Sequence, residues 1–167
     1  MYYPISIPQQ EDVAALLEHL QVVSIETDNL LLPPNMPDLT ENSVSQALRP
    51  NADTATLIVR DGEKIIGLAQ LFRSIWPKTR HRANVVMSVR QTYWGQRIAT
   101  SMTQRLEQIA LDMGISQIEL AVQADNLRAL TLYERCGFMR VCTYPDFFQE
   151  EESGTYTDAY LMRKPVF

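Results

Sequence analysis

The stretch VRQTYWGQRIAT, residues 89–100, decides the fold. A β-rich, largely apolar run, Ala83–Val89, ends where this stretch begins, and a strongly amphipathic segment, Gly95–Met113, overlaps its end. Apolar residues recur in that segment at positions 98, 102, 106, 109 and 113, which is the spacing of one helix face. The stretch therefore predicts an interior strand, a short turn and a long helix that begins at Gly95.

The rest of the chain alternates between strand and helix patterns. A tight turn at Asp61-Gly62 predicts a central hairpin. The patterns predict further strands at residues 2–7, 56–60, 64–72, 115–122, 138–144 and 156–162, and helices at 10–23, 40–48 and 126–136. This order, β-α-α-β-β-β-α-β-α-β-β, is typical of an α/β fold with a mixed sheet and helices on its faces. We expect one domain over residues 1–167.

Composition excludes several functional classes. The chain has 167 residues, 46% of them hydrophobic, with 15 Lys+Arg against 20 Asp+Glu and a net charge of -5. A negative balance disfavours a nucleic-acid partner. Two histidines and two cysteines leave little for a metal site. The amino terminus is unlike a signal peptide, and no apolar run approaches the roughly 18 residues of a membrane span. We expect a cytoplasmic protein without a metal, nucleic-acid or membrane partner.

The start of the long helix is a candidate anion site. A helix start presents unpaired N–H groups and a partial positive charge, and Gly95 removes a side chain where a phosphate needs close backbone approach. An ordinary strand-to-helix connection has the same pattern, so the turn alone leaves both interpretations open. Neither G-x-x-x-x-G-K-[ST] nor a G-x-G-x-x-G after a predicted strand is present, which excludes the usual ATPase and dinucleotide loops.

A second segment, VQADNLRALTLYERCGF at residues 122–138, favours the functional interpretation. Together the two segments resemble the GNAT superfamily of acyl-CoA-dependent N-acetyltransferases. The family's first signature, [QR]-x-x-G-x-[GA] opening a helix after a strand that ends in Val, corresponds to Trp94–Ala99. Its second signature, V-x-x-x-N-x-x-A-x-x-x-Y-x-x-x-G-F, is matched at Val122, Asn126, Ala129, Tyr133, Gly137 and Phe138. The carboxyl-terminal residues 154–162 look like the amino-acid and phosphinothricin-type branch.

The resemblance implies a mostly antiparallel sheet that is splayed between its fourth and fifth strands. It also implies transfer of an acetyl group from acetyl-CoA, as co-substrate, to a primary amine by direct attack. The acceptor would be a small molecule such as an amino acid or analogue. A protein or ribosomal N-terminus and a non-catalytic acyl-CoA sensor remain alternatives. The family is compatible with a homodimer, which no exposed apolar stripe in the sequence requires.

The resemblance also assigns roles to residues. Asn126 and Ala129 would contact the cofactor, and the Tyr133 hydroxyl would protonate the departing thiolate, which makes Tyr133 and Asn126 the candidate catalytic residues. An N–H group near Val89 would polarise the thioester carbonyl. Backbone groups would bind pantetheine at Met87, Ser88 and Val89, and the pyrophosphate at Trp94, Gly95, Gln96, Arg97, Ile98, Ala99 and Thr100.

Two departures from the family pattern matter for the chemistry. Arg97 replaces a glycine of the phosphate loop, so its Cβ could crowd the pyrophosphate or its guanidinium could pair with it. Asn84 stands where relatives often place a carboxylate that acts as general base, and asparagine cannot titrate. A water chain, Glu26, Asp28 or no base at all could fill that role, and the sequence does not choose between them.

Overall fold

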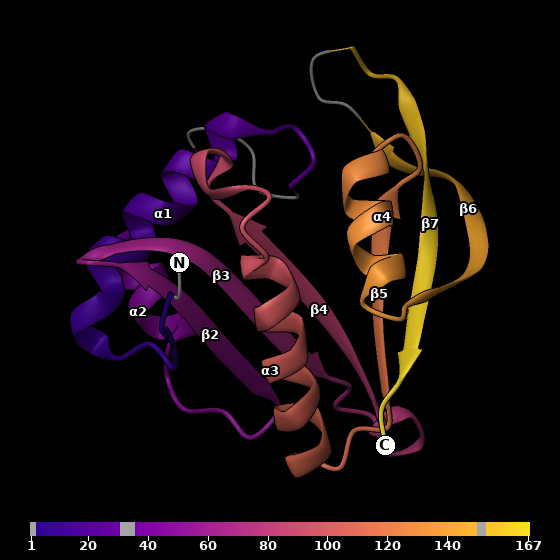
Figure 1. Cartoon of the computed structure of the whole chain (residues 1–167), viewed down its shortest axis with the longest axis horizontal. Coiled ribbons are helices and arrows are strands. Elements are labelled where there is room, and N and C mark those ends of the chain that lie inside the picture. Colours follow the sequence, from indigo (N-terminus) through magenta and orange to yellow (C-terminus); the bar gives the residue numbers. More distant parts are fainter. Residues whose placement is uncertain (1–2, 31–35, 150–152) are drawn as a thin grey trace. The chain divides into compact units, whose positions relative to one another are not determined.

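The computed structural model describes residues 3–30, 36–149 and 153–167, and its elements follow the predicted order (Figure 1). The chain divides into two compact units. The first unit comprises Met1–Phe72 and Val86–Leu106, and the second comprises Arg73–Val85 and Glu107–Phe167. The assignment of residues 1–167 to one domain stays a prediction.

The strands of the first unit are β1 (Ile5–Ser6), β2 (Thr54–Asp61), β3 (Lys64–Arg73) and the second half of β4 (Arg82–Val89). β1 pairs antiparallel with β2, and β2 pairs antiparallel with β3. The predicted hairpin is confirmed, and Gly62 supplies the positive φ of +59° that its turn needs.

Helices α1 (Val13–Glu26) and α2 (Glu41–Ala47) pack on one face of the β2–β3 hairpin. Thr40 caps α2, because its side chain accepts a hydrogen bond from the Ser43 N–H. The side chains packed on this face are Leu16 of α1, Val44 of α2, and Ile58, Ile65 and Leu68 of the strands.

The other face of the hairpin is covered by α3 (Ile98–Asp112). A Cβ added at Gly67 would lie 3.2 Å from Cγ2 of Ile98 and 3.3 Å from Cε of Met102, so the helix approaches β3 closely. Gly67 precedes Leu68, and successive strand residues point to opposite faces. The prediction of helices on both faces is therefore confirmed within this unit.

The second unit contains the first half of β4, then β5 (Gln117–Gln123), β6 (Met139–Gln149) and β7 (Tyr156–Pro165). β4 and β5 are parallel over three residue pairs, ending at Asn84 and Glu119, and β5–β7 and β7–β6 are antiparallel. Since β4 runs through both units, the hydrogen-bonded strand order is β1-β2-β3-β4-β5-β7-β6. The predicted mixed, mostly antiparallel sheet is confirmed, and a short β4–β5 ladder agrees with the expected splay.

Helix α4 (Leu127–Arg135) belongs to the second unit and carries the second signature. The ammonium of Lys164 on β7 donates to the carbonyl oxygen of Cys136 at 2.6 Å, which ties the end of α4 to that strand. The same ammonium pairs with the Glu107 carboxylate near the end of α3. These contacts fix the orientation of α4 within its unit.

Several predicted boundaries are wrong, and backbone geometry gives the reason for the main one. The long helix begins at Ile98 rather than Gly95, because Gly95 and Arg97 have φ angles of +80° and +62°, which a right-handed helix excludes. The last two strands run to Gln149 and Pro165, well past their predicted ends. The predicted first strand shrinks to Ile5–Ser6, and Tyr2 lies outside the described residues.

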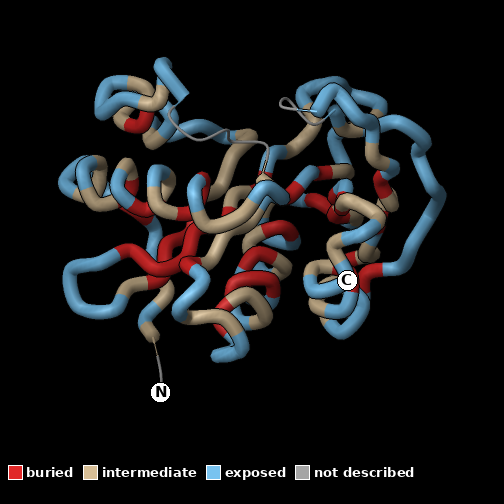
Figure 2. The backbone as a smooth tube through the Cα atoms, turned by 90° about the horizontal axis from the view of Figure 1, so that it is seen from above, coloured by how far each residue is buried: buried red, intermediate tan, exposed pale blue. Residues whose placement is uncertain are grey.

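Burial is concentrated in the hairpin of the first unit (Figure 2). Five consecutive residues of β3, Ile65–Ala69, are buried, because helices cover both faces. By contrast, almost all of β6 is exposed. Of the helices in the described ranges, none is both long and apolar enough to cross a membrane.

Candidate functional site

The turn between β4 and α3 forms a concave run of backbone N–H groups. Gly95 and Arg97 are both left-handed, and such alternation turns successive N–H groups towards one side. The first N–H groups of a helix have no intrahelical acceptor, which here applies to Ile98, Ala99 and Thr100. The Ser101 N–H makes the next bond, to the Arg97 carbonyl at 3.0 Å. The Trp94 N–H already donates to the Gln91 carbonyl at 3.1 Å, so Trp94 does not supply a backbone donor, contrary to the prediction. Residues 95–100 can bind an anion with backbone donors, and we call them the N–H cradle.

Arg97 has a φ of +62°, in the left-handed region that favours glycine. A non-glycine residue in the left-handed region costs about 1 kcal/mol, which the surrounding structure must offset. Its side chain is exposed, and within residues 3–30, 36–149 and 153–167 it forms no ion pair. The guanidinium is therefore available to an anion at the cradle.

Side chains from distant parts of the first unit anchor the cradle. The Trp94 indole Nε1 donates to the Val89 carbonyl at 2.7 Å. The Tyr93 hydroxyl donates to Asp61 in the hairpin turn at 2.8 Å, and the Tyr3 hydroxyl donates to Gln96 Oε1 at 3.0 Å. These bonds hold a turn that regular secondary structure does not stabilise.

The end of β4 offers further backbone groups. The Arg90 N–H donates to the Ile66 carbonyl of β3 at 2.9 Å. Backbone groups alternate in direction along an antiparallel strand, so the N–H groups of Met87 and Val89 point away from β3. They are available to a ligand, and the sequence analysis assigned these positions to pantetheine.

The sequence analysis missed a buried polar pair behind this strand. The His19 Nδ1–H donates to the Ile65 carbonyl at 3.1 Å, and His19 Nε2 accepts from the Ser88 hydroxyl at 2.9 Å. Burial lowers the His19 pKa to about 4, so the ring is neutral at pH 7. The one available signal was the position of His19 three residues after Leu16, on the apolar face of the predicted helix.

In the second unit, Asn126 is the N-cap of α4. Its Oδ1 accepts from the Ala129 N–H at 3.1 Å, which joins two of the signature residues. This contact is structural, and a ligand contact by either residue stays a prediction.

Tyr133 lies on the same helix in an apolar setting. Its ring packs edge-on against Phe138 with centroids 5.5 Å apart, and the hydroxyl forms no hydrogen bond with any described residue. Burial raises the Tyr133 pKa to about 12. The phenol is then about 3.5 pKa units, or about 5 kcal/mol, too weak an acid for complete proton transfer to an ordinary thiolate. Tyr133 is suited to donate a hydrogen bond from a neutral hydroxyl.

No residue of the described chain stands out as a general base. Asn84 and Asp28 are exposed, and the Glu26 carboxylate accepts from the Gln91 N–H at 2.7 Å. The described residues contain no group of three or more His, Cys, Asp or Glu side chains that could hold a metal ion. The predicted site residues thus form two groups, one at the end of β4 in the first unit and one on α4 in the second.

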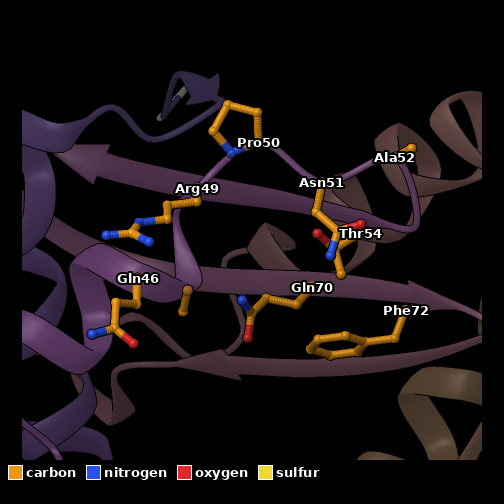
Figure 3. Close-up of a pocket in the computed structure, with 9 residues that line it drawn as sticks. Gln46, Arg49, Pro50, Asn51, Ala52, Thr54, Gln70 and Phe72 are labelled. Atoms are coloured by element: carbon orange, nitrogen blue, oxygen red, sulfur yellow. The ribbon is translucent and has the colours of Figure 1, made fainter.

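A cavity of about 620 Å³ lies elsewhere in the first unit (Figure 3). Figure 3 shows Gln70 and Phe72 on β3 below the α2–β2 connection. Its described lining contains one charged side chain, that of Arg49, and none of the predicted site residues. The lining residues are Gln46, Ala47, Arg49, Pro50, Asn51, Ala52, Thr54, Gln70 and Phe72.

Comparisons with known proteins agree with this geometry. A curated relative, N-alpha-acetyltransferase 30 of Schizosaccharomyces pombe, is 28% identical over 108 residues, which cover 64% of this chain and 70% of the relative. A GNAT-family acetyltransferase from Streptococcus pneumoniae superposes with a TM-score of 0.92 at 25% identity, over 99% of this chain and 100% of the other.

A third similar protein shares the fold at lower identity. It is a putative acetyltransferase from Salmonella typhimurium, solved with its cofactor acetyl-CoA, with a TM-score of 0.86 at 15% identity over 100% of this chain and 95% of the other. The sequence model described as the acetyltransferase (GNAT) family matches residues 20–138, most of the chain and both signatures. The chain has an N–H cradle at the start of α3 and an α4 that is capped by Asn126. It belongs to the GNAT family of acetyltransferases.

Proposed function

We propose that the protein transfers the acetyl group of acetyl-CoA to the primary amine of a small molecule, such as an amino acid or analogue. The observation that carries this proposal is the N–H cradle. A diphosphate fits this turn for three reasons: its backbone donors lack intrahelical acceptors, two of its residues are left-handed, and the Arg97 side chain is exposed. The Salmonella typhimurium relative that was solved with acetyl-CoA supports the choice of ligand.

The first unit would bind and polarise the acetyl donor. The cradle, Gly95–Thr100, holds the pyrophosphate, and the backbone groups of Met87 and Val89, which point away from β3, pair with the pantetheine arm as an added strand does. The Val89 N–H points away from β3 and donates to the thioester oxygen as that oxygen gains negative charge.

The residues of the second signature would serve the leaving group. The amine attacks the thioester carbon, the C–S bond breaks, and the sulfur leaves as a thiolate. The neutral Tyr133 hydroxyl donates a hydrogen bond to that thiolate, and Asn126 and Ala129 contact the cofactor. The amine's surplus proton leaves to solvent water, because no base is assigned.

A second candidate acceptor is the N-terminal amine of a protein. The name of the Schizosaccharomyces pombe relative, N-alpha-acetyltransferase 30, favours it. A ribosomal-protein-S18-alanine N-acetyltransferase from Escherichia coli also shares the fold, with a TM-score of 0.74 at 18% identity over 99% of this chain and 94% of the other. Both acceptor classes present a primary amine, so the donor half of the proposal is the same.

Thiol release from acetyl-CoA tests the proposal. The assay uses one panel of free amino acids and amine analogues and a second panel of short peptides with different N-terminal residues. A free amine that turns over at least ten times faster than every peptide supports the small-molecule acceptor. Faster peptide turnover moves the assignment to the second candidate, and no release with either panel contradicts both.

Initial-rate kinetics test direct attack. Intersecting double-reciprocal lines are expected, because donor and acceptor must be bound together. Parallel lines would indicate a covalent acyl-enzyme and contradict this part of the proposal.

A further inference from the structure

A β-bulge in the first unit releases one carbonyl group from the sheet. Val59 pairs with Gly67, but the next residue, Arg60, pairs with Ile65, so Ile66 is an extra residue in β3. The Arg60 N–H donates to the Pro4 carbonyl at 3.3 Å. The Ile65 carbonyl is therefore free to accept bonds from side chains.

Two buried side chains use this carbonyl. It accepts from His19 Nδ1–H at 3.1 Å and from Arg90 Nε–H at 2.8 Å. His19 Nε2 also accepts from the Ser88 hydroxyl, and Arg90 Nη2 pairs with Glu18 of α1 at 3.1 Å. We call these residues, Glu18, His19, Ile65, Ser88 and Arg90, the Ile65 network.

The network fixes both neighbours of Val89. Ser88 is held through its hydroxyl, and Arg90 is held through its Nε, its Nη2 and its own N–H, which bonds to Ile66. His19 is 0% exposed and Arg90 8%, so water does not compete strongly for their two bonds to the Ile65 carbonyl, whereas the Glu18 carboxylate is more exposed. The peptide groups on either side of Val89 therefore have little rotational freedom.

We propose that His19 and Arg90 are positioning residues for acyl transfer. By holding Ser88 and the Arg90 backbone, they orient the Val89 N–H that lies between them. This inference rests on the proposed function, in which that N–H donates to the oxygen of the transition state. A donor must be aimed at the site of developing charge before reaction, and a misplacement of about 1 Å can cost up to about a hundredfold in rate.

A role for His19 as general base fits the same contacts less well. The ring is fully buried, its Nδ1–H is already donated to Ile65, and its Nε2 is already occupied by the Ser88 hydroxyl. A pKa of about 4 also makes it a weak acceptor for the proton of an amine. The two roles predict different pH profiles, which the experiment uses.

The test compares Ser88→Ala and His19→Phe with Ser24→Ala. Ser24 is the control, because it is buried on α1 as His19 is, and its hydroxyl donates to the Gln21 carbonyl at 2.8 Å, so its removal also costs one side-chain hydrogen bond. Acetyl transfer is measured per folded molecule, together with the calorimetric Kd for coenzyme A. We expect kcat to fall about tenfold in Ser88→Ala and His19→Phe, with Kd within about twofold, since only a transition-state contact is lost.

Four further results support the inference. Ser24→Ala keeps the wild-type kcat, the double variant His19→Phe/Ser88→Ala is no slower than the slower single variant, and the pH profile keeps its shape at a lower plateau. Arg90→Lys, which keeps the charge but loses the Nε donor, lowers kcat by a similar factor.

Two results would overturn it. Wild-type kcat in Ser88→Ala and His19→Phe, with only a lower Tm, would reduce the network to a structural role. Loss of a pH-dependent limb in His19→Phe would make His19 a base instead. If the wild-type protein binds no coenzyme A, the proposed function itself fails. That failure is distinguishable from failure of the inference, because the wild-type titration shows it without any variant.

Discussion

The end of β4 and the helix α4 carry the two groups of candidate site residues, but they are held in different ways. At the end of β4, bonds join residues far apart in the chain: His19 reaches Ser88 across 69 positions and Ile65 across 46. On α4, the defining contacts are local: Asn126 bonds to Ala129, three residues on, and Tyr133 packs on Phe138.

This difference separates two ways of preparing a site. The first region holds backbone donors rigid with a buried polar network, whose members must all be paired to be stable. The second region presents one neutral phenol, that of Tyr133, whose pKa is raised chiefly by burial and in addition by the neighbouring Cys136 thiol. Substitutions in the two regions should therefore fail in different ways.

Replacing Tyr133 should give the largest effect. Tyr133→Phe removes the hydroxyl but keeps the ring that packs on Phe138, so the fold should persist. Loss of a hydrogen bond to the leaving thiolate should lower kcat about a hundredfold. Steady-state thiol release measures it, with the exposed Tyr144→Phe as control.

The pH dependence of kcat also tests the role of Tyr133. Because the Tyr133 pKa is about 12, wild-type kcat should show no loss from phenol ionisation between pH 8 and 10. An unchanged kcat in Tyr133→Phe would remove the residue from the mechanism and leave α4 with a structural role.

The second largest effect should be the loss of folding stability at acid pH that His19 of the Ile65 network causes. Burial lowers the folded-state pKa of His19 from 6.5 to about 4, so the unfolded chain binds this proton first as the pH falls. The stability that neutral His19 contributes is present above pH 6.5 and is lost as the pH falls through 6.5 towards 4. Between pH 7 and 5 the loss should be about 2 kcal/mol.

Urea unfolding at pH 7 and pH 5 measures this loss, with His19→Phe as the comparison. The variant should lose about 2 kcal/mol less than the wild type over the same interval. Equal losses in the two proteins would mean that His19 does not couple folding to protons.

Removing the N-cap of α4 should have a smaller effect. Asn126→Ala loses the bond to the Ala129 N–H and should lower the free energy of unfolding by about 1 kcal/mol, whereas Asn126→Asp should retain most of it. Chemical unfolding measures both. If Asn126→Asp restores stability but not activity, the amide also contacts the ligand; if it restores both, the proposed ligand contact is wrong.

The smallest expected effect is at Arg97. Arg97→Gly relieves the cost of a left-handed non-glycine residue and should raise the free energy of unfolding by about 0.5–1 kcal/mol. If the guanidinium pairs with the pyrophosphate, the same change should weaken coenzyme A binding about fivefold, and Arg97→Lys should weaken it less. Tighter binding by Arg97→Gly would show that the side chain crowds the ligand.

The same comparison explains what the sequence could predict. The element order and the hairpin at Asp61-Gly62 depend on local patterns, and the structure confirms them. The helix start at Gly95 was wrong, because the sequence does not show that Arg97 has a positive φ. The Ile65 network was missed, because it depends on a bulge in β3 and on contacts between α1, β3 and β4 that no local pattern encodes.

Calorimetric titration of coenzyme A, with pantetheine, which lacks the diphosphate and the 3′-phosphoadenosine, as the comparison ligand, tests the central claim most directly. If the N–H cradle binds the diphosphate, coenzyme A should bind to one site, and pantetheine should bind at least about a hundredfold more weakly, since several charge-assisted hydrogen bonds are lost. No heat with coenzyme A, or equal affinity for the two ligands, would contradict the account.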